Sequence, residues 1–212
     1  MRGDKGTVEH GGFLFRWWAV TALCYAGAVI ICTLAAFPSV LVGMHLARLG
    51  GIYAGYPGRA LGLALSLPGG YLLFGCTLLF LLCCVARLVP GTAWEGERGI
   101  DDPRNLGFFV VSAIRILAQH VFLPLITGTP LIVAFYRGMG ARIGKRTMVF
   151  TTKISDHCLV DIGRDCTLGV DCTIVCHSGR AGRWMRQPVI IGDGVTIGRG
   201  ATVMPGVRIQ DD

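Results

Sequence analysis

IGDGVTIGRGATVMPGVRI, residues 191–209, is the stretch that decides the fold, because an aliphatic residue returns at every sixth position. The same step continues upstream, less regularly. The repeating positions are Ile143, Val149, Ile162, Leu168, Ile174, Ile191, Ile197, Val203 and Ile209. A period of six fits neither a 3.6-residue helix nor a hairpin meander. It predicts a coil of parallel strands, in which each hexapeptide gives one short strand, with its aliphatic residue inward, and one corner.

The repeat is interrupted between Ile174 and Ile191. Residues 175–188, VCHSGRAGRWMRQP, have no six-residue rhythm and contain three arginines. A repeat protein tolerates an insertion at a corner, and such insertions often carry function. His177 stands at the edge of this insertion and is therefore the main candidate for chemistry.

The N-terminal part of the chain has the composition of a membrane segment. The whole sequence is 52% hydrophobic and only 16% charged, with a mean hydropathy of +0.58. Two long runs, from Arg16 to Arg48 and from Arg59 to Arg87, have no charged residue inside them. Each exceeds the roughly 20 residues that a helix needs to cross a bilayer. We expect residues 1–89 to be a membrane anchor of two antiparallel transmembrane helices, with the turn between them marked by the glycines and proline of residues 50–58.

Residues 90–138 are expected to leave the membrane through a polar linker and then form a third apolar segment. Arg115, Pro124 and Pro130 interrupt that segment, so it either lies in the membrane interface or spans the bilayer. Residues 139–212 form the predicted β-helix domain. Positive residues are denser before the first span and after the second than between them, which favours a multi-pass protein with the β-helix domain on the cytoplasmic side of a bacterial inner membrane.

Charge and cysteine content exclude some classes of function. The net charge is +7, but there is no dense Lys/Arg run with interleaved aromatic residues. We therefore expect membrane lipid, and not nucleic acid, as the partner of this charge. The nine cysteines include no C-x-x-C pair, so neither a metal site nor a disulfide framework is expected.

The motifs of the C-terminal third resemble a known superfamily. His177, the basic insertion, the PVIIGDGV of residues 188–195 and the PGV of residues 205–207 resemble the sugar O-acetyltransferases among the hexapeptide-repeat acyltransferases. The GTP of residues 128–130, the GARIG of residues 140–144 and the DIG of residues 161–163 are similar, more closely, to the membrane-attached terminal region of nonribosomal peptide synthetase-like proteins. The resemblance implies a mixed fold: transmembrane α-helices followed by a left-handed parallel β-helix of hexapeptide repeats.

The resemblance also implies an activity. It suggests a homotrimeric acyltransferase that moves an acyl group, such as acetyl, from CoA or from a phosphopantetheine carrier protein in trans to a hydroxyl or amine. His177 would be the general base, with no metal involved. The implied donor-binding residues are Arg183 and Arg186 for the phosphates, and Gly198, Gly200 and Ala201 along the donor arm.

Several alternatives remain open. Thr196 stands where the sugar enzymes often have an aromatic residue, which favours a non-catalytic trimeric β-helix that organises partner enzymes at the membrane. Asp156 and Asp161 are either corner residues or partners that orient His177. His157 is interpreted as an exposed corner residue. Only His157 and His177 fall in the repeat region, so the three-histidine zinc site of the γ-class carbonic anhydrases is not expected.

Overall fold

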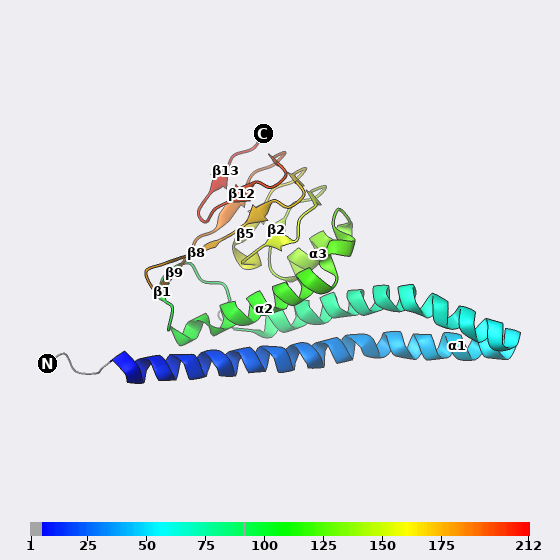
Figure 1. Cartoon of the computed structure of the whole chain (residues 1–212). Coiled ribbons are helices and arrows are strands. Elements are labelled where there is room, and N and C mark those ends of the chain that lie inside the picture. The colour runs from blue at the N-terminus through cyan, green and yellow to red at the C-terminus, as the bar shows by residue number, and fades with distance from the viewer. Residues whose placement is uncertain (1–5, 91) are drawn as a thin grey trace.

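A long helical hairpin forms the base of the molecule. The computed structural model describes residues 6–90 and 92–212. Helix α1 (Gly6–Leu88) departs from helical dihedrals only at Ala54 and Gly55, where the chain reverses, and Figure 1 shows its two halves side by side. Gly55 has a φ of 61°, which glycine adopts at little cost. The reversal is sharper than predicted, since most of residues 50–58 remain helical.

Small residues allow the two halves of α1 to approach closely. A Cβ at Gly50 or Gly58 would collide with the backbone of the other residue, and a Cβ at Gly62 would collide with Leu46. Close backbone approach through small residues is the usual way for helices to pair in a membrane. Helix α1 is long and apolar enough to cross a bilayer, which agrees with the predicted anchor.

Shorter helices lie between α1 and the sheets (Figure 1). They are η1 (Pro103–Asn105), α2 (Leu106–Val121), η2 (Leu123–Ile126) and α3 (Pro130–Gly138). The Tyr71 hydroxyl of α1 donates a 2.6 Å hydrogen bond to the carbonyl oxygen of Val121, and the Tyr71 ring packs against Phe122. With 16 residues, α2 is about 24 Å long, less than the roughly 30 Å hydrocarbon core.

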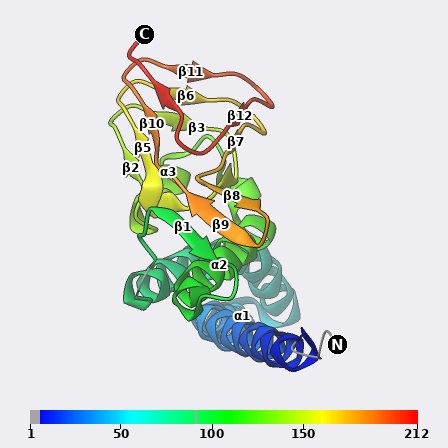
Figure 2. The same cartoon turned by 90° about the vertical axis from the view of Figure 1, so that its left-hand side faces the viewer.

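The hexapeptide region forms three parallel sheets. Their strand orders are β2–β5–β10–β13, β3–β6–β11 and β4–β7–β12, so the chain visits the three sheets in turn (Figure 2). The strands are β2 (Arg142–Ile143), β3 (Met148–Val149), β4 (Lys153–Ile154), β5 (Val160–Ile162), β6 (Thr167–Leu168), β7 (Thr173–Ile174), β10 (Val189–Ile191), β11 (Thr196–Ile197), β12 (Thr202–Val203) and β13 (Arg208–Ile209). Parallel strands visited in this order are the arrangement that the six-residue repeat predicts.

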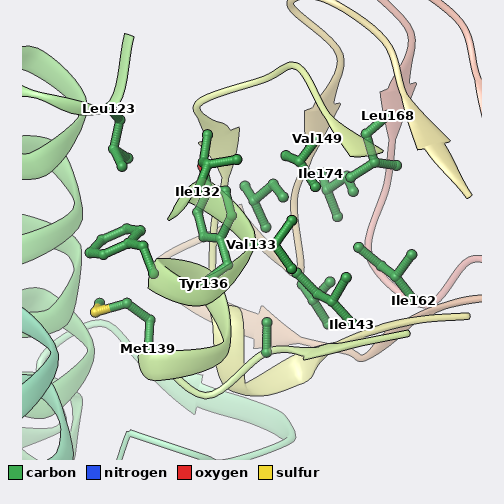
Figure 3. Packing of buried hydrophobic residues seen from close by; sticks show 14 of the residues in the cluster. Leu123, Ile132, Val133, Tyr136, Met139, Ile143, Val149, Ile162, Leu168 and Ile174 are labelled. Carbon is green, nitrogen blue, oxygen red and sulfur yellow. The ribbon is translucent and has the colours of Figure 1, made fainter. Parts of the chain in front are cut away.

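The aliphatic residues of the repeat form the core between the sheets. Equivalent positions pair in register: Ile162 with Ile191, and Leu168 with Ile197. All but the last of the predicted inward positions are buried, which confirms that part of the prediction; they are Ile143, Val149, Ile162, Leu168, Ile174, Ile191, Ile197 and Val203. Figure 3 shows α3 adding Ile132, Val133 and Tyr136 to this core. The core therefore continues from the sheets into the helical layer.

The insertion is an ordered hairpin and not an irregular loop. Strands β8 (His177–Arg180) and β9 (Arg183–Arg186) pair antiparallel. Ala181 and Gly182 connect them with φ values of 47° and 75°, the left-handed pair typical of a tight two-residue hairpin turn. Strand β1 (Gly96–Gly99), from the predicted polar linker, pairs with β9 as a third strand. The segment that follows helix α1 is thus joined to the insertion (Figure 2).

Candidate active site

His177 and Asp156 form the centre of the candidate site. His177 is the first residue of β8 and aligns with Arg186 at the base of the hairpin. Nδ1 of its ring lies 2.6 Å from Oδ2 of Asp156. The Asp156 side chain is 1% exposed and that of His177 is 26% exposed. Asp156 has a left-handed backbone with a φ of 50°, a conformation that aspartate tolerates better than most residues.

Arg186 completes a buried cluster around this carboxylate. Its Nη2 lies 3.1 Å from Oδ1 of Asp156, and its Nη1 donates a 2.7 Å hydrogen bond to the carbonyl oxygen of Thr92. The side chain is only 2% exposed. The structure therefore corrects the predicted role of Arg186: its guanidinium faces Asp156 inside the protein and is not accessible to the phosphates of a donor.

The cluster keeps Asp156 ionised. Burial raises the pKa of the Asp156 carboxyl, but hydrogen bonds from His177 and Ser155 and the positive charge of Arg186 lower it below its ordinary value. The stability that this carboxylate contributes is therefore present above its ordinary pKa and is lost as the pH falls through the lowered pKa. The ionised carboxylate accepts a hydrogen bond at Oδ2 from Nδ1–H of His177. This places the neutral ring in the tautomer whose Nε2 is free to act as a base.

Aromatic residues enclose the His177 ring. The ring centroids of Phe108 and Trp184 lie 5.2 Å and 5.4 Å from that of His177, both in edge-to-face geometry. Phe108 also lies 5.2 Å from the Arg186 guanidinium, and Trp94 lies 5.0 Å from it. Phe108 comes from α2, so the helical layer itself helps to hold both the histidine and the arginine.

A small cavity lies next to the cluster, between α2 and the sheets. It has a volume of about 20 Å³ and is lined by Ser112, Arg115, Asp156, His157 and Arg186, among other residues. A cavity of this size holds roughly one water molecule. It is too small for an acyl acceptor, so any substrate must reach His177 from the exposed side of its ring.

His157 is buried, which corrects its interpretation as an exposed corner residue. It is 1% exposed and stacks on Tyr136 of α3 with a centroid distance of 5.2 Å. Burial, reinforced by the charge of Arg115, lowers the pKa of His157 to about 3. His157 is therefore neutral at physiological pH and acts as a packing residue between α3 and the sheets.

The other predicted donor-binding residues lie apart from this cluster. Arg183 is on the surface and pairs with Glu97 of β1 at 2.9 Å. Gly198 and Gly200 lie on the corner between β11 and β12, where an added Cβ would meet nothing within 4 Å. Ala201 lies on the same corner, and its carbonyl oxygen accepts a hydrogen bond from the Thr173 backbone. Within residues 6–90 and 92–212, no group of three or more His, Cys, Asp or Glu side chains is placed to hold a metal ion.

The orienting role of Asp156 was one of two alternatives predicted from the sequence, and the role of the helical layer was not predicted. The structure resolves the two aspartates: Asp156 contacts His177, whereas Asp161 pairs with Arg142 at 2.8 Å. No sequence motif marked Phe108 or Trp94 as site residues, because their proximity to His177 and Arg186 depends on how α2 and the linker pack. A buried arginine was also unexpected in a surface insertion.

Together, the fold and the site define an apolar helical hairpin that carries three parallel sheets, with a buried carboxylate holding a partly exposed histidine where the layers meet. Comparison of the chain with protein-family models, with curated proteins and with solved structures finds no match. The function is therefore inferred from the geometry of this site.

Proposed function

We propose that this chain is a membrane-anchored acyltransferase in which His177 is the general base. In this proposal the three sheets close into a left-handed β-helix, and the two halves of α1 both cross the membrane, with the sheets on the cytoplasmic side. The observation that carries the proposal is the 2.6 Å hydrogen bond between Nδ1 of the partly exposed His177 and the buried Asp156. A histidine oriented by a buried carboxylate is an arrangement that suits proton abstraction from a hydroxyl.

The proposed reaction begins with a hydroxyl or amine near Nε2 of His177. As the acceptor attacks the carbonyl carbon of a thioester, Nε2 takes its proton. The imidazolium that forms is stabilised by Asp156, which stays ionised because Arg186 and His177 lower its pKa. When the carbon–sulfur bond breaks, the thiolate recovers the proton and His177 is ready for another cycle.

The donor is proposed to be acetyl-CoA, another acyl-CoA or a carrier-protein thioester. The open corner at Gly198 and Gly200 offers room for a pantetheine arm. Of the two arginines predicted to bind phosphate, Arg183 is the one at the surface, so it is retained for this role and Arg186 is not. A homotrimer with the donor between subunits belongs to the same proposal. Because α1 anchors the enzyme, the acceptor is expected to be membrane-bound, such as a lipid-linked sugar or a peptide product.

The test is a thiol-release assay with the full chain in detergent micelles. His177→Ala should lower acyl transfer from acetyl-CoA by about 10²- to 10⁴-fold, and Asp156→Asn should lower it too because the ring loses its preferred tautomer. His120→Ala is the matched control, since His120 is an exposed histidine on α2. Activity that survives in His177→Ala would refute the assignment. A stable trimer without saturable CoA or carrier binding would favour a non-catalytic scaffold.

A further inference from the structure

An apolar groove runs between the end of α1 and helix α3. It has a volume of about 750 Å³, within the range of about 300–1,000 Å³ that ligand sites occupy. Its walls include Leu79, Phe80 and Leu88 of α1 and Leu131, Ala134 and Phe135 of α3. Several of these side chains are exposed, so the groove opens to the surroundings along the apolar helix α1.

Arg87 lines the groove, and Arg137 is the penultimate residue of α3, the helix that forms its other wall. Arg87 donates from Nε and Nη2 to the carbonyl oxygens of Gly138 and Arg137 at the end of α3. Arg137 in turn donates to the carbonyl oxygens of Ile143 and Gly144. Both arginines are exposed, and the ion pairs of the described residues do not include either one. Backbone carbonyls thus hold two positive charges in place without neutralising them.

We propose that this groove binds the hydrocarbon chains of an anionic phospholipid, whose head group lies at Arg87 and Arg137. The apolar walls suit a hydrocarbon chain, and fixed guanidinium groups suit a phosphate. A second copy of the chain is a poorer occupant. Residues 17–94 contain no Asp or Glu, so a copy packed through this part of α1 would bring no negative charge to the two arginines. The inference depends on the membrane placement of α1 and not on the transfer reaction.

The experiment uses the full chain in vesicles that contain phosphatidylglycerol with a photoreactive diazirine in its acyl chain. We expect the labelled peptides to map to residues 76–88 and 131–138. Phosphatidylcholine with the same photoreactive chain should label these peptides less at equal mole fraction, by about five-fold for each arginine that contributes. Ala134→Trp should fill the groove and lower the labelling by a similar factor.

The matched control is Ala64→Trp, which adds the same side chain to an exposed position of α1 outside the groove and should leave the labelling unchanged. Labelling that spreads evenly along α1, that does not distinguish the two lipids, or that persists in Ala134→Trp would overturn the proposal. Protein–protein cross-links at the groove in place of lipid adducts would show a second copy there and would also overturn it. A chain that fails to float with the vesicles would refute its membrane basis, whatever the result of the acyl-transfer assay.

Discussion

Replacing Arg186 with methionine tests whether the buried ion pair stabilises the site. Nη2 of Arg186 lies 3.1 Å from Oδ1 of Asp156, and both side chains are almost fully buried. At an effective dielectric constant of about 20, two unit charges at this distance attract by about 5 kcal/mol. Methionine keeps much of the side-chain length but removes the charge and the donor to Thr92. We expect Arg186→Met to lower the free energy of unfolding by about 3–5 kcal/mol at pH 7, because it leaves a buried carboxylate poorly compensated.

The double variant Arg186→Met/Asp156→Asn removes both charges of the pair. Asparagine tolerates the left-handed backbone of residue 156, so this change adds little strain. Since the uncompensated charge disappears, the double variant should be more stable than Arg186→Met by at least about 1–2 kcal/mol. The pair would then be coupled in the sense of a double-mutant cycle.

Urea unfolding of the full chain in detergent micelles measures these free energies. Tryptophan fluorescence is a suitable probe, because Trp94 packs on the Arg186 guanidinium. The control is Arg142→Met, which breaks a surface pair with Asp161 whose side chains are 78% and 38% exposed; it should be indistinguishable from the wild type. Equal losses in Arg186→Met and Arg142→Met, or a double variant whose loss equals the sum of the single losses, would refute the reasoning.

Three further predictions concern the packing of the sheets. The pKa of His157 is lowered from 6.5 to about 3 in the folded chain. Between these two pH values the His157 side chain is protonated in the unfolded chain but neutral in the folded chain. The free energy of unfolding should therefore fall by about 3 kcal/mol from pH 7 to pH 4 through this residue, and His157→Phe should lack that part of the loss in a pH series of urea titrations. Gly144→Ala should lower the free energy of unfolding by about 1–3 kcal/mol, because the added Cβ would collide with the backbone of Gly163 and Arg164. The added Cβ of Gly198→Ala meets open space, so this variant should keep the wild-type melting temperature. Leu168→Ala should lower the free energy of unfolding by about 2–5 kcal/mol in the same urea assay. Val170→Ala, at an exposed position, should change it little.

The parallel sheets could be predicted because their signal is local and repeated. Each inward residue follows the previous one by six positions, and burial of Ile162, Leu168 and Ile174 depends only on that spacing. The same reasoning failed for His157, since its burial depends on Tyr136 in α3, an element that no repeat connects to it. Local periodicity specifies a coil, but it does not specify which coil another element covers.

The candidate site was predictable in part for a similar reason. His177 stood out because it interrupts a regular pattern, and Asp156 was one of two aspartates near enough to contact it. Arg186 was expected to bind the phosphates of a donor, because the resemblance implied that role for the arginines of the insertion. Its burial depends on the pairing of β9 with β1 and on the carbonyl oxygen of Thr92, and neither partner has a recognisable sequence pattern.

The pairing of β1 with β9 has a consequence for the order of folding. Thr92 and Arg186 are separated by 94 residues, and two of the three turns through the sheets are made between them. Contacts so distant in sequence form late, because the intervening chain must first become ordered. During synthesis the linker strand therefore emerges well before its partner, and the carboxylate of Asp156 has neither His177 nor Arg186 until the hairpin is made. Catalytic competence would thus arise only in a chain that has already made the first two turns of its sheets, so a chain that lacks them would not have the proposed activity.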